Sequence, residues 1–216
     1  MKWGGDKMNE TVISRATLGR IPIYLEYLKG LSRERETISA TAIARDLGLG
    51  EVQVRKDLGA LCRAGRPKIG YNTDELISCL EGYFETDRVG AVLIGGSHFS
   101  RALLDFSGFE DLGFDLMAAF DKKITVKETS ERGKPVLPID SLSDFCSCRN
   151  VALGIIDLPP ESAQSACDML YKNNIKAIWC ISPCRLTVPP DVIVEYENMV
   201  TSSAYLKMQI DMRRTK

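Results

Sequence analysis

The sequence predicts an α/β protein, with a small helical unit ahead of a doubly wound parallel sheet and a further helix at the C-terminus. Helical periodicity dominates the first part of the chain. From Val89 onward, short β-branched apolar runs alternate with amphipathic stretches, as in parallel sheets covered on both faces. We therefore divide the 216 residues into a tail (1–11), a helical domain (12–85), a sheet domain (86–197) and a C-terminal helix (198–216).

Composition excludes several classes of protein. The chain is 44% hydrophobic and 26% charged, without the run of about 18 apolar residues that a membrane span requires or an apolar signal segment at its start. We expect a cytoplasmic protein with no membrane partner. The single histidine, His98, excludes sites that need several histidines, so we expect no catalytic residue and no metal site. An NAD-dependent oxidoreductase, the less favoured alternative, would have only His98 as its acid or base.

The net charge of −1 conceals two segments of opposite sign. Residues 12–71 contain eleven Lys or Arg and six Asp or Glu, whereas the rest of the chain contains seventeen and twenty-three. A basic segment next to an acidic remainder indicates that one part of the protein contacts a polyanion.

The basic segment contains a predicted helix-turn-helix. Apolar residues at helical spacing predict a first helix from Ile21 that ends near Gly30. Ser39 is placed to cap a second helix, Gly48-Leu-Gly50 forms a turn, and a third helix covers residues 51–61. Two short helices joined by a glycine-containing turn are typical of the helix-turn-helix.

A predicted wing and linker follow these helices. Residues 65–71 are small, basic and turn-rich, which indicates a two-stranded wing. Asn72 with Glu75 resembles a capping box that opens a linker helix to about Phe84. The order of helix, turn, helix and wing predicts an N-terminal winged helix-turn-helix domain.

In such a domain the second helix of the pair enters the DNA major groove. Gln pairs with adenine, and Arg or Lys pairs with guanine or phosphate; cations on a wing suit the backbone or minor groove, and hydroxyls at a helix N-terminus suit a phosphate. The candidate DNA-binding residues are Gln53, Arg55 and Lys56 on the helix, Arg66 and Lys68 on the wing, and Ser39 and Thr41 at the helix start. The alternative is that Arg55-Lys56-Asp57 is only a solvated helix face. The basic surplus and the order of the motifs favour DNA binding.

A glycine turn follows the first predicted strand of the sheet domain. Gly95, Ser97 and Ser100 stand at the three glycine positions of the Rossmann fingerprint G-x-G-x-x-G, so only its first glycine is kept. Asp121, twenty-six residues after Gly95, stands where an acidic residue binds the adenosine ribose. The alternatives are an ordinary tight turn and an aspartate that caps a strand end.

From about Ser14 to Lys207 the chain resembles the Rex family of redox-sensing transcriptional repressors. The resemblance is carried by Arg20-Ile-Pro-Ile-Tyr-Leu-Glu-Tyr-Leu-Lys-Gly30, Gln53-Val-Arg-Lys-Asp-Leu58, Lys68-Ile-Gly-Tyr-Asn72, Ala118-Ala-Phe-Asp121, Ala163-Gln164 and Ser182-Pro-Cys-Arg-Leu186. It implies a winged-helix domain joined to a Rossmann-like domain, in a homodimer interlocked by swapped C-terminal helices on a palindromic DNA operator. It also implies that NADH releases the DNA, whereas NAD+ permits repression.

The implied NAD(H) site departs from the family pattern. The cofactor-binding candidates are Gly95, Gly96, Ser97, His98, Phe99, Ser100, Asp121, Pro159, Ser182 and Pro183. Asp157 stands where the family has a threonine, Asn198 where it has an aspartate, and Phe106 where it often has a tyrosine. A carboxylate at position 157 is unfavourable beside a pyrophosphate. Two readings remain open: a repressor that responds to NADH/NAD+, and a Rex-like repressor that has replaced this response by another ligand or by thiol oxidation.

The seven cysteines are expected to be reduced and mostly buried, because the chain has no secretion signal. The candidates for thiol chemistry are Cys146 and Cys148, on a polar connection, and Cys180 and Cys184, in the presumed cleft. The favoured alternative is that these cysteines are buried and inert.

The last helix carries more apolar side chains than one packed face requires, so we expect it to pack on a second chain.

Overall fold

The computed structural model describes residues 13–31, 36–62, 65–66, 69–84 and 88–214. The chain divides into two compact units, Met1–Thr86 and Asp87–Lys216. Each unit buries a hydrophobic core of its own.

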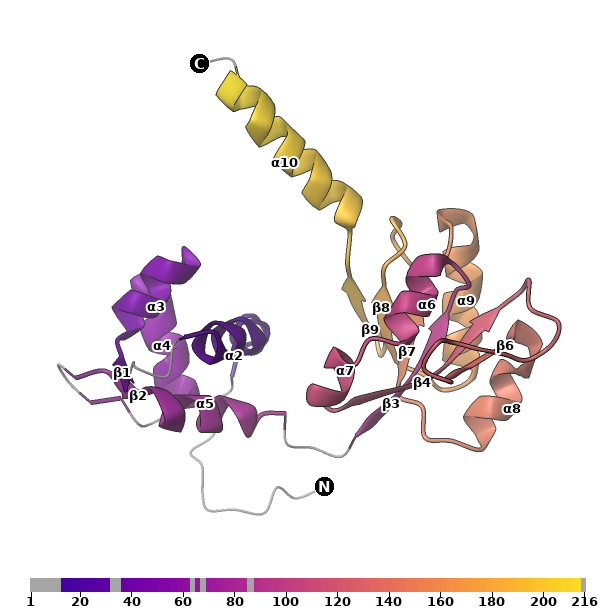
Figure 1. Ribbon diagram of the computed structural model, residues 1–216, viewed down its shortest axis with the longest axis horizontal. Coiled ribbons are helices and arrows are strands. Elements are labelled where there is room, and N and C mark those ends of the chain that lie inside the picture. The colour runs from indigo at the N-terminus through magenta and orange to yellow at the C-terminus, as the bar shows by residue number, and fades with distance from the viewer. Residues whose placement is uncertain (1–12, 32–35, 63–64, 67–68, 85–87, 215–216) are drawn as a thin grey trace. The chain divides into compact units, whose positions relative to one another are not determined.

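The N-terminal unit is mainly helical (Figure 1). In chain order its elements are α1 (Arg15–Leu18), α2 (Ile21–Lys29), β1 (Thr37–Ile38), α3 (Ala40–Leu47), α4 (Glu51–Leu61), β2 (Tyr71–Asn72) and α5 (Thr73–Glu81). Ser39 caps α3 by accepting a hydrogen bond from the Ala42 amide at 3.1 Å. Gly48 ends α3 in the left-handed conformation, with φ 66°, which glycine adopts without a steric penalty. The predicted helix-turn-helix is therefore confirmed.

The predicted wing differs in its pairing. We expected two strands within residues 65–71, but the described residues before Tyr71 form only an isolated bridge between Arg66 and Gly70. The strand β2 pairs instead with β1, which precedes α3. A Cβ on Gly70 would lie 2.4 Å from the Ile38 carbonyl oxygen, so glycine allows the chain to cross β1 closely.

The linker helix α5 begins as expected and ends earlier. The Asn72 side chain accepts a hydrogen bond from the Glu75 amide at 2.9 Å. The helix ends at Glu81, and the residues from Gly82 to Phe84 form turns rather than the expected last helical turn. Asp74 and Glu75 in the first turn interact favourably with the helix dipole.

A disulfide joins Cys62, which follows α4, to Cys79 in α5. The expectation that the cysteines are reduced is wrong for this pair. Both helices pack into one core through Leu58, Leu61 and Leu76, and this packing brings the two Cα atoms to 6.2 Å. The free cysteines of the described chain are Cys146, Cys148, Cys167, Cys180 and Cys184.

The C-terminal unit contains a seven-stranded sheet in the order β5-β6-β4-β3-β7-β8-β9. The strands are β3 (Val89–Ile94), β4 (Phe114–Asp121), β5 (Glu128–Thr129), β6 (Pro135–Pro138), β7 (Leu153–Ile156), β8 (Ala177–Cys180) and β9 (Ile193–Tyr196). All neighbours pair in parallel except β5 with β6. The strand β4, which follows β3 in the chain, pairs on one side of β3, and the later strand β7 pairs on the other side. The order of the strands therefore reverses at β3, so the carboxyl end of β3 is a topological switch point.

Helices cover both faces of this sheet, as predicted. The helices of this unit are α6 (His98–Leu104), α7 (Gly108–Asp111), α8 (Leu142–Ser147), α9 (Pro160–Lys172) and α10 (Met199–Arg214), with a 3-10 turn at Ile139–Ser141. Of these, α10 buries no described side chain and does not cover the sheet. Val92 of β3 packs in one core with residues of α8 and α9, whereas its neighbours Ala91 and Leu93 pack in another core with Leu104 of α6. This alternation is that of a strand buried on both faces.

Several elements were not predicted from the sequence, among them β6 and α8. The strand β6 was missed because it is short and bounded by prolines. The segment that contains Cys146 is not the polar connection we expected but the helix α8, whose Leu142 is buried and whose last turn leads to Cys148.

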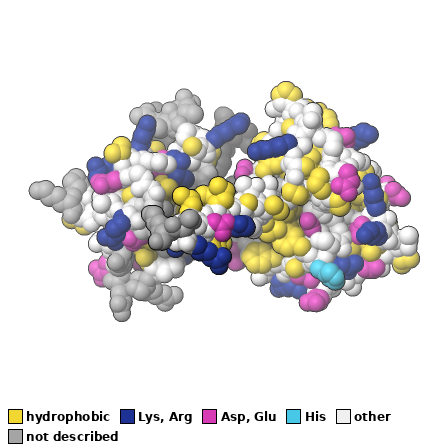
Figure 2. Space-filling model, turned by 90° about the horizontal axis from the view of Figure 1, so that it is seen from above, with side chains coloured by type: hydrophobic (Ala, Val, Ile, Leu, Met, Phe, Trp, Pro, Cys, Tyr) yellow, Lys and Arg dark blue, Asp and Glu magenta, His cyan; other side chains and the backbone are white. Residues whose placement is uncertain are grey.

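The C-terminal helix α10 has no buried side chain among its described residues. Its exposed large hydrophobic residues are Met199, Val200, Tyr205, Leu206, Met208, Ile210 and Met212. On the face of the molecule seen in the space-filling view, hydrophobic side chains lie between charged ones (Figure 2). Within the described ranges, no helix combines the length and the hydropathy needed to cross a membrane.

Candidate DNA and nucleotide sites

The helix α4 presents two chemically different faces. Val54 and Leu58 are fully buried in the N-terminal core, whereas Gln53, Arg55 and Lys56 are exposed. Because buried and exposed positions follow the helical repeat, the polar side chains share the surface that a helix-turn-helix turns toward DNA.

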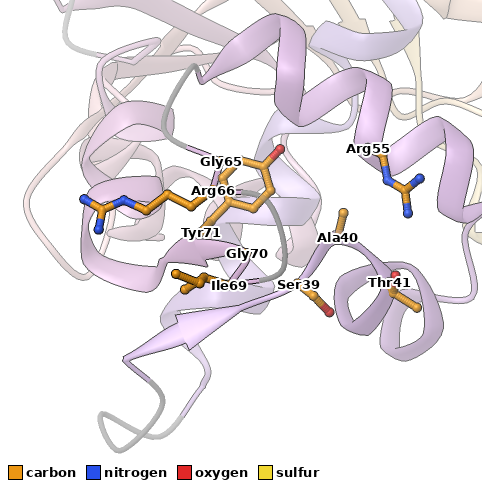
Figure 3. A pocket seen from close by; sticks show the side chains of 9 residues that line it. All are labelled: Ser39, Ala40, Thr41, Arg55, Gly65, Arg66, Ile69, Gly70 and Tyr71. Carbon is orange, nitrogen blue, oxygen red and sulfur yellow. The ribbon is translucent and has the colours of Figure 1, made fainter.

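A hollow of about 530 Å³ lies beside α4 in the N-terminal unit (Figure 3). It is lined by Ser39, Ala40, Thr41, Arg55, Gly65, Arg66, Ile69, Gly70 and Tyr71. In Figure 3 the guanidinium groups of Arg55 and Arg66 extend away from each other at its two ends. The hollow thus brings together four of the predicted DNA-binding residues; Gln53 and Lys56 are exposed on α4 outside it, and Lys68 lies outside the described residues.

Two of the predicted side chains on α4, Arg55 and Gln53, have partners within the chain. Arg55, whose side chain is 64% exposed, forms an ion pair with Glu51 one turn earlier in α4. The Gln53 amide, oriented with its oxygen toward Arg20, accepts hydrogen bonds from Nε at 3.1 Å and Nη1 at 3.0 Å. These contacts hold both side chains at the surface.

The buried side of α4 is held in place by the carboxylate of Asp57. Asp57, only 4% exposed, accepts hydrogen bonds from the Thr17 hydroxyl at 3.0 Å, the Tyr24 hydroxyl at 2.8 Å, and Arg20 Nε at 2.6 Å and Nη2 at 2.9 Å. The alternative that Arg55-Lys56-Asp57 is only a solvated helix face does not hold for Asp57, which is buried. Its position in the helical repeat with buried Val54 and Leu61 was the signal that it lies inside.

The hydrogen bonds around Asp57 determine the protonation states of Asp57 and Tyr24. Burial alone raises the pKa of Asp57, but the hydrogen bonds from Arg20, Tyr24 and Thr17 outweigh it, and the pKa lies below the usual 3.8. Burial, followed by the bond to Asp57, raises the pKa of Tyr24 to about 12. The Asp57 carboxylate is therefore ionised and the Tyr24 hydroxyl protonated at neutral pH.

A second cavity, of about 330 Å³, lies at the switch point of the sheet in the C-terminal unit. It is lined by Ile94, Gly96, Ser97, Phe120, Asp121, Lys122, Lys123, Asp157, Leu158, Pro159, Ser162 and Met169. Most of these residues come from the carboxyl ends of β3, β4 and β7 and from the starts of the segments that follow, whereas Met169 lies in the second half of α9. Nucleotide sites of open α/β sheets occupy this position.

The predicted cofactor-binding residues are distributed around this cleft. Gly96, Ser97, Asp121 and Pro159 line it. A Cβ on Gly96 would lie 1.7 Å from Asp121 Oδ2, so glycine permits the carboxylate to lie against the turn.

Gly95 and the start of α6 surround the turn. Gly95 is buried, and its amide donates to the Phe120 carbonyl at 2.9 Å. Ser100 is fully buried, whereas His98 and Phe99 are exposed at the start of α6.

Ser182 and Pro183 do not line the cleft. The Ser182 hydroxyl accepts a hydrogen bond from the Leu158 amide at 3.0 Å and so supports the cleft wall from behind. Pro183 is exposed. Burial raises the pKa of the nearby Cys180 thiol to about 11, which disfavours the reactive thiolate.

Comparison with known proteins places the chain in a family. The family described as "Putative DNA-binding protein N-terminus" matches residues 12–59, and the family described as "CoA binding domain" matches residues 87–184. A redox-sensing transcriptional repressor Rex of Clostridium tetani is 35% identical over 91% of this chain and 96% of that protein. The chain belongs to the Rex family. A second Rex repressor, from Bacteroides thetaiotaomicron, is 31% identical over 95% of this chain and 94% of that protein.

Solved structures of Rex repressors have the same fold. The crystal structure of RSP in complex with β-NAD+ and operator DNA matches with a TM-score of 0.83 and 28% identity, over 95% of this chain and 96% of that one. RSP in complex with β-NADH matches with a TM-score of 0.82 and 27% identity, over 95% and 98%. The winged-helix and Rossmann-like architecture is thus that of the Rex family.

The cleft of this Rex protein fits one part of NAD(H) better than another. Asp121, held against Gly96 and accepting a hydrogen bond from the Lys123 amide at 3.1 Å, has the position and chemistry to bind the hydroxyls of an adenosine ribose. At the turn itself, Ser97 and Ser100 both donate hydrogen bonds to the carboxylate of Asp157. The residues therefore fit the adenosine end, and a diphosphate on the turn would lie beside a negative charge.

Proposed function

We propose that the protein is a transcriptional repressor that binds a palindromic DNA operator as a homodimer and whose DNA binding responds to NADH/NAD+. The observation that carries this proposal is the division of α4 into a face fixed by Asp57 and an exposed face with Arg55 and Lys56. The Rex relatives, one of them crystallised with operator DNA and NAD+, support it.

The DNA-binding surface consists of α4 and the hollow beside it. Gln53, Arg55 and Lys56 contact base edges and phosphates from α4, because these side chains are exposed while the helix is fixed from behind. Arg66 contacts the neighbouring backbone, and Ser39 and Thr41 at the start of α3 bind a phosphate. In the absence of DNA, Arg55 pairs with Glu51. When DNA binds, Arg55 exchanges this single carboxylate for the more numerous phosphate groups.

The Rossmann-like cleft takes the dinucleotide. Asp121 binds the adenosine ribose, and Gly95 and Gly96 allow close approach of the turn to the ligand. When bound, NAD(H) supplies the redox signal; no turnover is expected, because His98 is exposed at the start of α6 rather than lining the cleft. The response to the dinucleotide is a change in operator affinity.

The homodimer forms through α10. Leu206 and Ile210 lie one turn apart on one side of this helix, and Tyr205, Met208 and Met212 follow a second stripe. All five side chains are exposed in the single chain. Apolar residues on two sides of a helix require more than one packing surface, which a second copy of the chain provides.

Selection of random duplex DNA by the purified full-length protein tests the proposal. We expect an inverted repeat to be enriched, and fluorescence anisotropy on that duplex to show release of the protein by NADH but not by NAD+. If no sequence is enriched, the repressor function is wrong. If an operator is found but NADH and NAD+ leave its affinity equal, only the cofactor response is wrong.

A further inference from the structure

Three side chains form a cluster across the glycine turn of the C-terminal unit. The Ser97 hydroxyl donates to Asp157 Oδ2 at 2.6 Å, and the Ser100 hydroxyl donates to the same oxygen. Ser97 and Ser100 lie at the start of α6, whereas Asp157 follows β7, about sixty residues later. The carboxylate is thus held by two hydrogen bonds rather than free to turn away.

The backbone also fixes Asp157 at this place. Its amide donates to the Ile94 carbonyl at 3.0 Å, and a Cβ on Gly95 would lie 2.5 Å from its carbonyl oxygen. Asp157 lines the cleft together with Gly96 and Ser97. Its negative charge therefore lies at the glycine turn, on which a Rossmann domain seats the diphosphate of a dinucleotide.

The cluster removes two favourable features of a phosphate site. A carboxylate next to a diphosphate is repelled, and the repulsion is strong in a partly desolvated cleft. The two serine hydroxyls already donate to Asp157, so their hydrogens are not available to phosphate oxygens. Lys122 and Lys123 also line the cleft, but they follow Asp121 at the end of β4 and are not part of the glycine turn after β3.

We propose that Asp157, held by Ser97 and Ser100, is a specificity-determining residue that weakens the binding of diphosphate-containing ligands while leaving the adenosine part of the cleft intact. This inference rests on the proposed nucleotide function of the cleft. Its consequence is that the protein responds only to high concentrations of NADH, and that one carboxylate sets this threshold.

Binding of NADH, ADP and adenosine to the full-length protein tests the inference, because the three ligands share the adenosine part and only the first two carry a diphosphate. Asp157→Asn removes the charge and keeps an acceptor for both serines; Asp157→Ser replaces it with a short hydroxyl side chain. We expect both variants to bind NADH and ADP at least tenfold more tightly than the natural protein, and adenosine equally well. Asp144→Asn, an exposed position of α8 that does not line the cleft, is the control and leaves all three affinities unchanged.

The outcomes separate the inference from the function on which it rests. If adenosine binds and both variants bind ADP no more tightly than the natural protein, the role of Asp157 is wrong and the nucleotide site stands. If neither the natural protein nor any variant binds the three ligands, both the inference and the proposed cofactor site are wrong. An equal gain for adenosine and ADP also overturns the inference, because a charge effect on the diphosphate does not act on adenosine.

Discussion

Arg20 binds Asp57 on α4, the helix that carries side chains proposed to contact DNA. Nε of Arg20 lies 2.6 Å from Oδ2 of Asp57 and Nη2 lies 2.9 Å from Oδ1. The same guanidinium group donates to the amide oxygen of Gln53 on the exposed face of α4. One arginine thus bridges the buried carboxylate of Asp57 and the amide of Gln53, a side chain proposed to contact DNA.

Asp57→Asn is expected to destabilise the N-terminal unit by about 3 kcal/mol, because it leaves Arg20 without its charged partner in a largely buried site. Urea unfolding followed by circular dichroism measures this loss. Asp74→Asn, at an exposed position of α5, is the matched control; it removes only an interaction with the helix dipole and should cost less than about 1 kcal/mol.

The same pair predicts a dependence on pH. Because the pKa of Asp57 in the folded protein lies below its unfolded value, the carboxylate contributes stability above about pH 4, and this contribution is lost as the pH falls through the folded pKa. The difference in unfolding free energy between the natural protein and Asp57→Asn should therefore shrink below pH 4. A difference that stays constant from pH 7 to pH 3 would contradict the assignment.

Arg55→Ala is expected to reduce specific operator affinity by about 1–3 kcal/mol and to relax the base preference at one position of each half-site. Anisotropy titrations on the selected operator and on single-base variants measure both effects. Arg149→Ala, which removes the same charge from the C-terminal unit, should change neither. Equal losses for Arg55→Ala and Arg149→Ala would show that only net charge matters.

Gly96→Ala is expected to lower NADH affinity at least tenfold, about 1.4 kcal/mol, since the added Cβ would displace the Asp121 carboxylate that lies 1.7 Å from its position. Gly59→Ala in α4, where a Cβ meets nothing within 4 Å, should leave NADH affinity unchanged. Isothermal titration calorimetry with NADH measures the affinity of both variants. Retention of full affinity by Gly96→Ala would show that Asp121 has no part in the site.

Reduction of the Cys62–Cys79 disulfide is expected to cost about 3 kcal/mol of unfolding free energy, because the bond closes a loop with a sequence separation of 17 residues. Urea unfolding with and without a phosphine reductant measures this cost, and Cys79→Ala should remove the effect of the reductant. Cys148→Ala, at an exposed free cysteine, should preserve it. Identical unfolding curves in both conditions would show that the bond does not stabilise the unit.

Leu206→Glu combined with Ile210→Glu is expected to convert the proposed homodimer into monomers, because two charges on one stripe of α10 prevent its burial against a partner. Sedimentation equilibrium measures the change. Ser203→Glu, which adds a charge to the same helix at a polar position, should weaken the dimer far less. A dimer that survives the double substitution would place the interface elsewhere.

The helices of the N-terminal unit were predictable because their signals are local. Ser39 caps α3 through an amide three residues away, and Gly48 ends it by adopting a conformation that its own lack of a Cβ allows. Such short-range interactions are encoded within one helical turn. The same holds for Asn72 at the start of α5.

The contacts that define the two sites were decided by the tertiary structure. Asp57 meets Arg20 across 37 residues, and Asp157 meets Ser97 across 60, so neither partner is implied by local spacing. The pairing of β2 with β1 and the approach of Cys62 to Cys79 depend likewise on how elements pack. The sequence by itself determined most of the longer helices and strands, the order of the two units and the family. Only the packed chain decided which charges are buried, because burial depends on residues that are distant in sequence and adjacent in space.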